Sequence, residues 1–358
     1  MKLTGDIIFS AGILADTDIW RLNLETRRLT QLTSGTAANE QPRWSPSGHR
    51  IAFVSNRDNG IPKLFLMDDQ GGHLTQLITS DRFCDGVCWF PDGTRLLFSS
   101  NFVDPNEIDL FSLPIDKPDS PNRLMTAEGI ESNPSISPDG HRVLYSVASS
   151  PSEVGLPRNY DIWEYDFMSG QRRQMTDHLL RDFSPRYAPD GRRFAFISQR
   201  NPTQEGDLVD AVTNLQHLVQ SKAPMDEIDQ GIRAVQRLEQ SADLWLMDRN
   251  HPKSAKRLTS GQLISSSFSW SPDSRYICYA AAEAQGDGVS RLHIVDTHTG
   301  DYEELDFDRS PLKVELKTTD EDLLNKTWLS RLIPDILERG MIPRIVHGSE
   351  AQPDWRRI

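Results

Sequence analysis

The chain contains 358 residues, of which 37% are hydrophobic and 25% charged, and its formal net charge is −13. This is the composition of a folded, turn-rich protein and excludes an intrinsically disordered chain. The acidic balance argues against nucleic acid as a partner, because phosphate binding requires a concentrated basic surface. No stretch of 18 apolar residues is present, so no segment is predicted to insert into a membrane.

The N-terminus and the cysteines bear on the compartment. Residues 1–6 include an acidic side chain where a signal peptide has an apolar stretch. We therefore expect a cytoplasmic protein if Met1 is the native start, and a periplasmic or secreted one if a signal peptide has been removed. Three cysteines do not make a disulfide framework, so Cys84 and Cys88 are predicted to be buried free thiols.

A five-residue phrase recurs along the chain and predicts the architecture. Its typical form is an aromatic residue followed by Ser, Pro, Asp and Gly. Proline presets φ, aspartate bonds to nearby backbone and glycine accepts positive φ, so each copy predicts a tight turn. The copies occupy residues 44–48, 89–93, 136–140, 187–191 and 270–274. Self-similarity at a period of about 40 to 50 residues is typical of a propeller.

Each repeat is predicted to form four strands. An apolar run after the turn forms the second strand, as at residues 50–55 and 193–198. A third-strand signature occurs six times, at residues 18–20, 63–65, 109–111, 161–163, 243–245 and 291–293. Six signatures predict six blades, although no turn phrase precedes residues 6–10. Because a propeller must close, we predict that Leu312–Leu316 supplies the strand missing from the first blade.

The repeats resemble the WD40-like Pro-Asp repeats of the TolB-like β-propeller family, which also occur in prolyl-oligopeptidase-like and tricorn-type proteases. The resemblance covers about residues 1–317 and implies an all-β, six-bladed β-propeller. It implies no single function, because propellers serve many unrelated roles. We expect neither the N-terminal α/β domain of TolB nor the hydrolase domain of the proteases.

Two segments lie outside the repeat. Within about residues 201–241, apolar residues recur at three- and four-residue steps on both sides of Pro224. This pattern predicts an α-helical hairpin inserted between the second and third strands of the fifth blade. Residues 318–358 are predicted to form a partly helical C-terminal extension and tail. In that extension Trp328 and Trp355 either pack the tail against the propeller or contact a partner.

Acidic residues precede the first strand of several repeats. They are Glu40, Asp85, Glu131 and Asp182, with Ser265 or Ser266 in the last repeat. Rotational symmetry predicts that they surround one mouth of the central channel, where they could bind a basic peptide or a cation such as calcium. The alternative is that each caps a turn and recurs only because the repeat recurs.

No catalytic constellation was found in the sequence. It holds neither a Gly-x-Ser-x-Gly nucleophile elbow nor a phosphate-binding glycine-rich loop with lysine. The histidines do not recur at equivalent inner-strand positions, so no metal site and no cofactor is predicted. Oligogalacturonate lyase, a related propeller enzyme, binds metal through clustered histidines, and no such cluster can be aligned here.

We therefore expect a non-enzymatic interaction module or scaffold. It would bind a protein or peptide partner at the acidic channel mouth, with the inserted hairpin and the tail selecting the partner. One alternative is a carbohydrate-active propeller enzyme resembling an oligosaccharide lyase. Another is a non-catalytic subunit of a protease or transport assembly. The sequence does not predict an oligomeric state.

Overall fold

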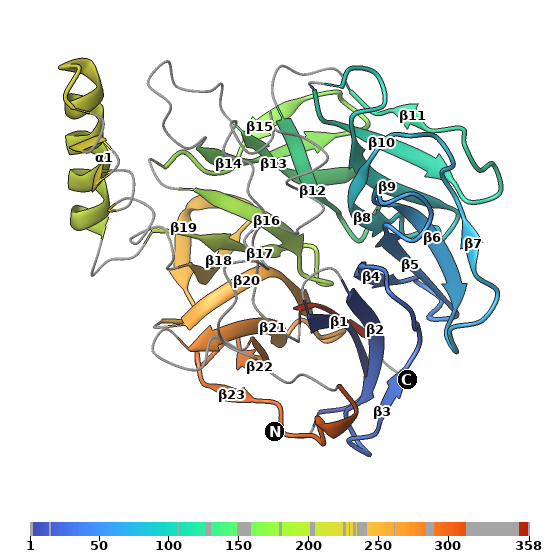
Figure 1. Ribbon diagram of the computed structural model, residues 1–358. Helices are drawn as coiled ribbons and strands as arrows, with labels where there is room; N and C mark the ends of the chain where they lie inside the picture. The colour runs from blue at the N-terminus through green and yellow to red at the C-terminus, as the bar shows by residue number, and fades with distance from the viewer. Residues whose placement is uncertain are drawn as a thin grey trace.

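The computed structural model describes residues 3–13, 16–105, 107–125, 130–148, 159–178, 181–200, 205–224, 227–228, 230–231, 234, 242–260, 262–283, 290–312 and 351–356. These residues form six antiparallel four-stranded sheets arranged around a common centre (Figure 1). The chain is an all-β, six-bladed β-propeller, as predicted from its repeats.

Each blade is one sheet, and the blades follow the order of the chain. The first blade contains β1 (Asp6–Ile13), β2 (Asp16–Asn23) and β3 (Leu29–Gln31). The second contains β4 (Asn39–Trp44), β5 (Arg50–Ser55), β6 (Lys63–Asp68) and β7 (Thr75–Gln76). The third contains β8 (Cys84–Trp89), β9 (Arg95–Ser100), β10 (Asp109–Pro114) and β11 (Asn122–Arg123). The fourth contains β12 (Ile130–Ile136), β13 (Arg142–Ala148), β14 (Tyr160–Asp166) and β15 (Arg172–Gln174). The fifth contains β16 (Asp182–Tyr187), β17 (Arg193–Ser198), β18 (Asp243–Asp248) and β19 (His251–Arg257). The sixth contains β20 (Gln262–Trp270), β21 (Tyr276–Glu283), β22 (Arg291–Asp296) and β23 (Tyr302–Glu304).

In the second to sixth blades the first strand lies innermost, and these inner strands, together with the innermost strand of the first blade, contact one another in turn around the centre of the ring, which we call the channel. The predicted turns join each inner strand to the second strand. Gly93, for example, has φ of 68° and donates its N–H to the carbonyl of Phe90 at 2.9 Å. The hydrophobic core lies between neighbouring blades. Ile8 and Ile19 of the first blade, for instance, pack with Trp44, Phe53 and Phe65 of the second.

The strand that closes the ring is not the one predicted. β24 (Ala351–Arg356) pairs with β1 and takes the innermost position of the first blade. Leu312, where the predicted strand begins, instead ends the short 3-10 helix η1 (Ser310–Leu312), and residues 313–316 lie outside the described part of the chain. The prediction rested on the alternation of apolar residues from Leu312 onwards. Alternation indicates a strand, but it does not show which segment of the chain pairs with β1.

Two contacts to Trp44 of the second blade and one ion pair within the first blade fix β24. Asp354 accepts a hydrogen bond from the backbone N–H of Trp44 at 2.6 Å through Oδ2. The Arg356 guanidinium lies 3.7 Å from the centroid of the Trp44 ring and forms an ion pair with Asp6 at 3.1 Å. The final strand therefore joins the first blade to the second as well as completing its own sheet.

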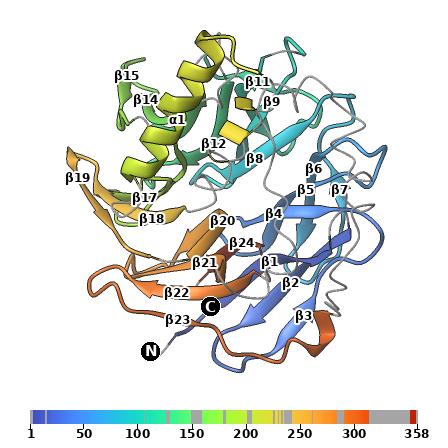
Figure 2. The ribbon, with the colours of Figure 1, turned by 60° about the vertical axis from the view of Figure 1, so that its left-hand side comes forward.

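The fifth blade carries the predicted insertion. Helix α1 (Glu205–Gln220) lies between β17 and β18, and it stands to one side of the sheets in Figure 1 and in front of them in Figure 2. Gly231 lies against Leu215 and Leu218 of α1, so the chain beyond Pro224 turns back along the helix. Most of the predicted second helix and residues 318–350 lie outside the described part of the chain.

Candidate functional site in the central channel

Each inner strand contains an irregularity near its middle. The pairing register shifts between Glu40 and Arg43 in the second blade, and between Phe183 and Arg186 in the fifth. A residue with positive φ lies at these positions, namely Gln41 at 53°, Gly86 at 64°, Asn133 at 52° and Ser184 at 52°. Three of the four are followed by proline, which a bulge tolerates because no ladder hydrogen bond is required there.

One inner-strand position, directly before the residue that opens or would open the turn phrase, is equivalent in all six blades. In blade order these residues are Asp354, Arg43, Cys88, Ser135, Arg186 and Ser269. We call this set the central ring. Arg43 and Arg186 come from blades on opposite sides of the ring, and repulsion from Arg43 helps to lower the pKa of Arg186. The two side chains therefore converge towards the channel axis.

Electrostatics in the central ring are dominated by burial. Burial, followed by repulsion from Arg43, lowers the pKa of Arg186 to about 9. Burial also lowers the pKa of Arg43, while the nearby Asp354 acts in the opposite direction. The pKa of Asp354 is raised by burial, and Arg43, the Trp44 N–H and Arg186 oppose that rise. The ring thus combines two guanidinium groups with one carboxyl group, and burial disfavours the charged form of all three.

The four predicted mouth residues do not share one position. Glu40 and Asp85 pair with Val54 and Ser99, whereas Asp182 pairs with Ser198, one residue further along its partner strand. Glu131 shares the position of Asp182. Because a shift of one residue turns a strand side chain to the opposite face, the expected ring of four carboxylates is not formed.

Glu131 and Asp182 instead lie fully buried between blades. Asp182 forms an ion pair with Arg200 of its own blade and interacts with Thr176 of the preceding blade. Glu131 lies 3.6 Å from Arg172, and burial raises its pKa to about 7. The second blade has Asn39 at this position, hydrogen-bonded to Ser55 at 2.9 Å and to the carbonyl of Thr17 at 2.8 Å. Of these contacts, Asp182 with Thr176 and Asn39 with Thr17 join neighbouring blades.

Glu40 and Asp85 remain as a pair of partly exposed carboxylates where β4 and β8 begin. Burial, followed by repulsion from Asp85, raises the pKa of Glu40 to about 7. Asp85 accepts a hydrogen bond from the side chain of Gln41, whose Oε1 accepts from the Gly86 N–H at 2.6 Å. Gln41 therefore bridges the two strands and holds Asp85 in place. We call Glu40 and Asp85 the mouth pair.

The two predicted tryptophan contacts have different outcomes. Trp355 lies in β24, is 8% exposed and donates its indole N–H to the carbonyl of Thr4 at 3.0 Å. It packs in the core of the first blade, which is the packing alternative of the two considered. Trp328 lies outside the described residues, as do the side chains of Ser265 and Ser266.

Sequence reasoning missed Arg43, Arg186 and Asp354. Their shared position could have been recognised, because each stands directly before an aromatic residue. For Arg43 and Arg186 this aromatic residue opens a turn phrase, and for Asp354 it is Trp355 at the end of the closing strand. Cys84 and Cys88 are buried free thiols, as predicted. Among the described residues, no group of three or more His, Cys, Asp or Glu side chains is placed to hold a metal ion, and no helix is long and apolar enough to cross a membrane.

The comparisons with known proteins agree with this architecture. Residues 5–157 match the family model of the TolB beta propeller domain. The solved structure of TolB from Acinetobacter baumannii superposes with a TM-score of 0.66 at 15% identity, over 99% of this chain and 67% of that one. Residues 5–157 are therefore similar to the TolB beta propeller domain, and the fold of the whole chain is similar to that of the TolB structure, as the repeats indicated.

Two curated relatives are similar in sequence over part of the chain. The Protein TolB homolog of Chlorobium luteolum is 30% identical over 158 residues, which is 44% of this chain and 33% of that protein. The Uncharacterized peptidase YuxL of Bacillus subtilis is 23% identical over 191 residues, 53% of this chain and 26% of that protein. The chain thus spans about a quarter to a third of the length of these relatives.

Proposed function

We propose that this propeller is a protein-interaction module that binds an extended segment of a partner at the channel mouth. The observation that carries the proposal is the mouth pair, two neighbouring carboxylates that keep partial exposure at the start of adjacent inner strands. A lysine or arginine side chain placed between them would relieve their mutual repulsion. Carboxylates that repel each other in this way form a site suited to a cationic group.

The position of the insertion also supports binding at the end of the channel where the mouth pair lies. β17 ends at Ser198, which pairs with Asp182 at the start of the inner strand β16. The chain therefore leaves β17 on the face where the inner strands begin, which is also the face of Glu40 and Asp85. α1 follows from this point, so it can select a partner that approaches the mouth.

The similarity to YuxL supports a second candidate. A peptidase relative is matched over about half of this chain, so the propeller can serve as the non-catalytic part of a peptidase assembly. This role differs from the first in requiring a stable, stoichiometric catalytic partner. Native mass spectrometry of the protein purified from its own host distinguishes the two, because only an assembly gives a constant additional mass.

Peptide phage display tests the leading proposal. A random linear library is selected on the immobilised wild-type protein and, in parallel, on the Glu40→Gln/Asp85→Asn double variant. We expect lysine- and arginine-containing sequences from the wild type and at least a tenfold weaker affinity of these peptides for the double variant. The matched control is Glu25→Gln/Glu303→Gln, which removes the same charge from exposed positions near outer strands.

Equal binding of the selected peptides to the wild type and to the mouth variant would place the interaction elsewhere. The same titration in the presence of calcium tests whether the mouth pair takes a cation. Competition between calcium and the peptides is expected if both use Glu40 and Asp85.

A further inference from the structure

The partly buried arginines of this propeller differ in how they are paired. Arg249 makes two hydrogen bonds to Glu164, at 2.6 and 2.9 Å, and Arg257 binds Asp243 at 2.6 and 3.0 Å. Both guanidinium groups therefore have a carboxylate partner in contact. Such pairing is the usual condition for burying a charged group.

Arg186 lacks such a partner among the described residues. Its guanidinium makes one long hydrogen bond, 3.4 Å from Nη1 to the carbonyl oxygen of Pro134, and no carboxylate oxygen of that part of the chain lies within 4 Å. Its side chain nevertheless keeps partial exposure, although it lies on an inner strand of the channel. The guanidinium donors that the Pro134 carbonyl does not engage are therefore available to a ligand.

The groups that face Arg186 define what that ligand would be. Across the channel lies Arg43, a second positive charge, and the remaining ring positions carry Cys88, Ser135 and Ser269 as neutral groups. Asp354 is the one acidic member of the ring, and its Oδ2 accepts the 2.6 Å hydrogen bond from the Trp44 N–H that fixes the closing strand. Asp85 lies nearer the mouth, where Gln41 and the Gly86 backbone hold it.

We propose that Arg43 and Arg186 bind a carboxylate carried by the partner segment, deeper in the channel than the mouth pair. Arginine forks match the planar geometry of a carboxylate, and charge-assisted hydrogen bonds of this kind are among the strongest. The inference rests on the proposed function for the nature of the ligand, a peptide with a basic residue at the mouth. The carboxylate is then either the C-terminal group of that peptide or an acidic side chain.

Three short peptides separate these sources. Acetyl-Lys-Gly-Gly carries a free C-terminal carboxylate, its C-terminal amide carries none, and acetyl-Lys-Gly-Asp-amide carries only a side-chain carboxylate. We expect isothermal titration to show about tenfold tighter binding of a carboxylate-bearing peptide than of the amide. Preference for the first peptide assigns the C-terminal group, and preference for the third assigns the acidic side chain.

Substitution locates the site. In Arg186→Gln the preference for a carboxylate is expected to disappear, whereas Arg186→Lys keeps the charge and part of the preference. Arg192→Gln removes an exposed arginine from the same blade and is expected to leave the preference unchanged. Thermal melts of all variants identify any that fail to fold. Equal affinity for all three peptides would overturn the inference, and it would leave peptide binding at the mouth pair intact.

A second measurement does not depend on peptide binding. Sodium acetate is titrated at constant ionic strength into ¹⁵N-arginine-labelled protein, and the Nε–H signal missing from Arg186→Gln is followed. A saturable shift of that signal supports a carboxylate site. No saturable shift overturns the inference, whether or not any peptide binds. Loss of peptide binding in the mouth variant alone bears on the proposed function.

Discussion

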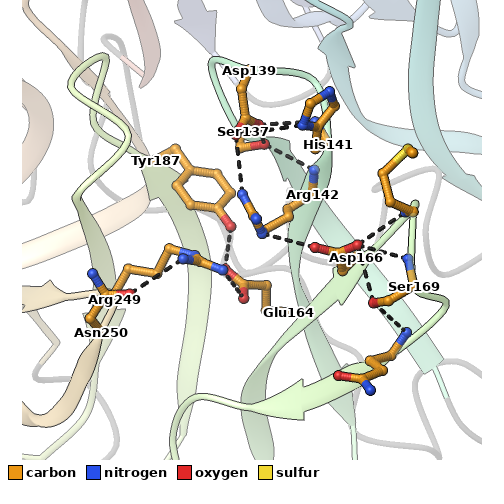
Figure 3. Close-up of polar contacts among 12 residues, drawn as sticks. Ser137, Asp139, His141, Arg142, Glu164, Asp166, Ser169, Tyr187, Arg249 and Asn250 are labelled. Carbon is orange, nitrogen blue, oxygen red and sulfur yellow. Dashed lines mark hydrogen bonds and ion pairs between the residues drawn. The ribbon is translucent and has the colours of Figure 1, made fainter.

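Individual buried charges hold neighbouring blades together in this propeller. Glu164 on β14 of the fourth blade accepts a 2.5 Å hydrogen bond from the Tyr187 hydroxyl and two from Arg249, both of the fifth blade (Figure 3). Burial, followed by the adjacent Glu164, raises the pKa of Tyr187, so the phenol remains a donor. One carboxylate thus satisfies donors from two segments of the next blade.

Removing this carboxylate is expected to destabilise the protein strongly. Glu164→Gln leaves the Arg249 guanidinium without its counter-charge in a largely buried position, at a cost of about 2–4 kcal/mol. Tyr187→Phe removes one hydrogen bond and should cost about 1 kcal/mol. Urea unfolding measures both. The control is Glu107→Gln, which breaks the more exposed 3.6 Å pair with Arg123 and should cost less than about 1 kcal/mol. Equal costs for the two glutamate variants would contradict this account.

Glu40 gives a prediction about pH. Its pKa is raised to about 7 in the folded protein from a usual value of 4.5, so between these values the folded state holds a proton that the unfolded state has lost. The free energy of unfolding therefore falls as pH rises from about 4.5 to 7. Glu40→Gln removes this contribution and should match the wild type near pH 4.5.

Above pH 7 the same variant should be more stable than the wild type. Because Glu40 keeps partial exposure, we expect a gain of about 1–2 kcal/mol and not the full value of its pKa shift. Urea unfolding at pH 5 and pH 8 measures the difference between the two proteins, and that comparison cancels the similar contribution of Glu131. A constant difference at both pH values would mean that Glu40 does not titrate in this range.

At the level of the elements, the inserted segment is separable from the blade that carries it. Ser198 at the end of β17 and Asp243 at the start of β18 are direct partners in the sheet. A turn of a few residues can therefore join them, as in an ordinary hairpin. The blade does not require residues 201–241 for its strand pairing.

Replacing residues 201–241 with Asn-Gly flanked by single glycines should leave the propeller folded. We expect unchanged β-sheet content by circular dichroism and a shift of the melting temperature of less than about 2 °C, equivalent to about 1 kcal/mol or less. If α1 selects the partner, the shortened protein should bind a wider set of peptides in the phage selection. Unfolding of the shortened protein would instead show that the insertion is part of the fold.

Turns and strands could be predicted from the sequence, whereas pairing between distant segments could not. The turn phrases and the Asp-initiated strands predicted six blades, because a turn and the strands beside it depend on neighbouring residues. The identity of the closing strand depends on pairing between distant segments. The position of Glu131 and Asp182 could be read from the spacing, because they stand five residues before the residue that opens the turn phrase, whereas Glu40 and Asp85 stand four.

The candidate site was predicted in part for the same reason. Glu40 and Asp85 lie where symmetry placed them, at the start of adjacent inner strands. The central ring was missed because its members differ in chemistry, from arginine to serine to aspartate. Their equivalence appears only when the position before each aromatic residue is compared between repeats. Asp354 additionally required knowing that β24 belongs to the first blade.

For the molecule as a whole, closure of the ring depends on its last strand. Truncation after residue 350 removes β24, leaving β1 as an unpaired edge and taking Trp355 from the core. Exposed edges promote association between chains. We expect the truncated protein to form oligomers in size-exclusion chromatography with light scattering, and a synthetic peptide of residues 349–358 to restore the monomer.

The same peptide with Trp355→Ala is the control. Truncating a buried tryptophan to alanine costs about 3–5 kcal/mol, so this peptide should fail to restore the monomer at equal concentration. Restoration by both peptides would show that backbone pairing alone closes the ring. A truncated protein that stays monomeric and keeps its melting temperature would contradict a role for β24 in stability.

The indole of Trp355 binds the carbonyl of Thr4 across 351 residues of sequence, and this contact sets an order of events during synthesis. A ribosome adds about 5–20 residues per second, so on the order of tens of seconds pass between the two residues. The first blade is therefore completed only after the other five have been made. Until β24 emerges, β1 has no inner neighbour and presents an unpaired edge.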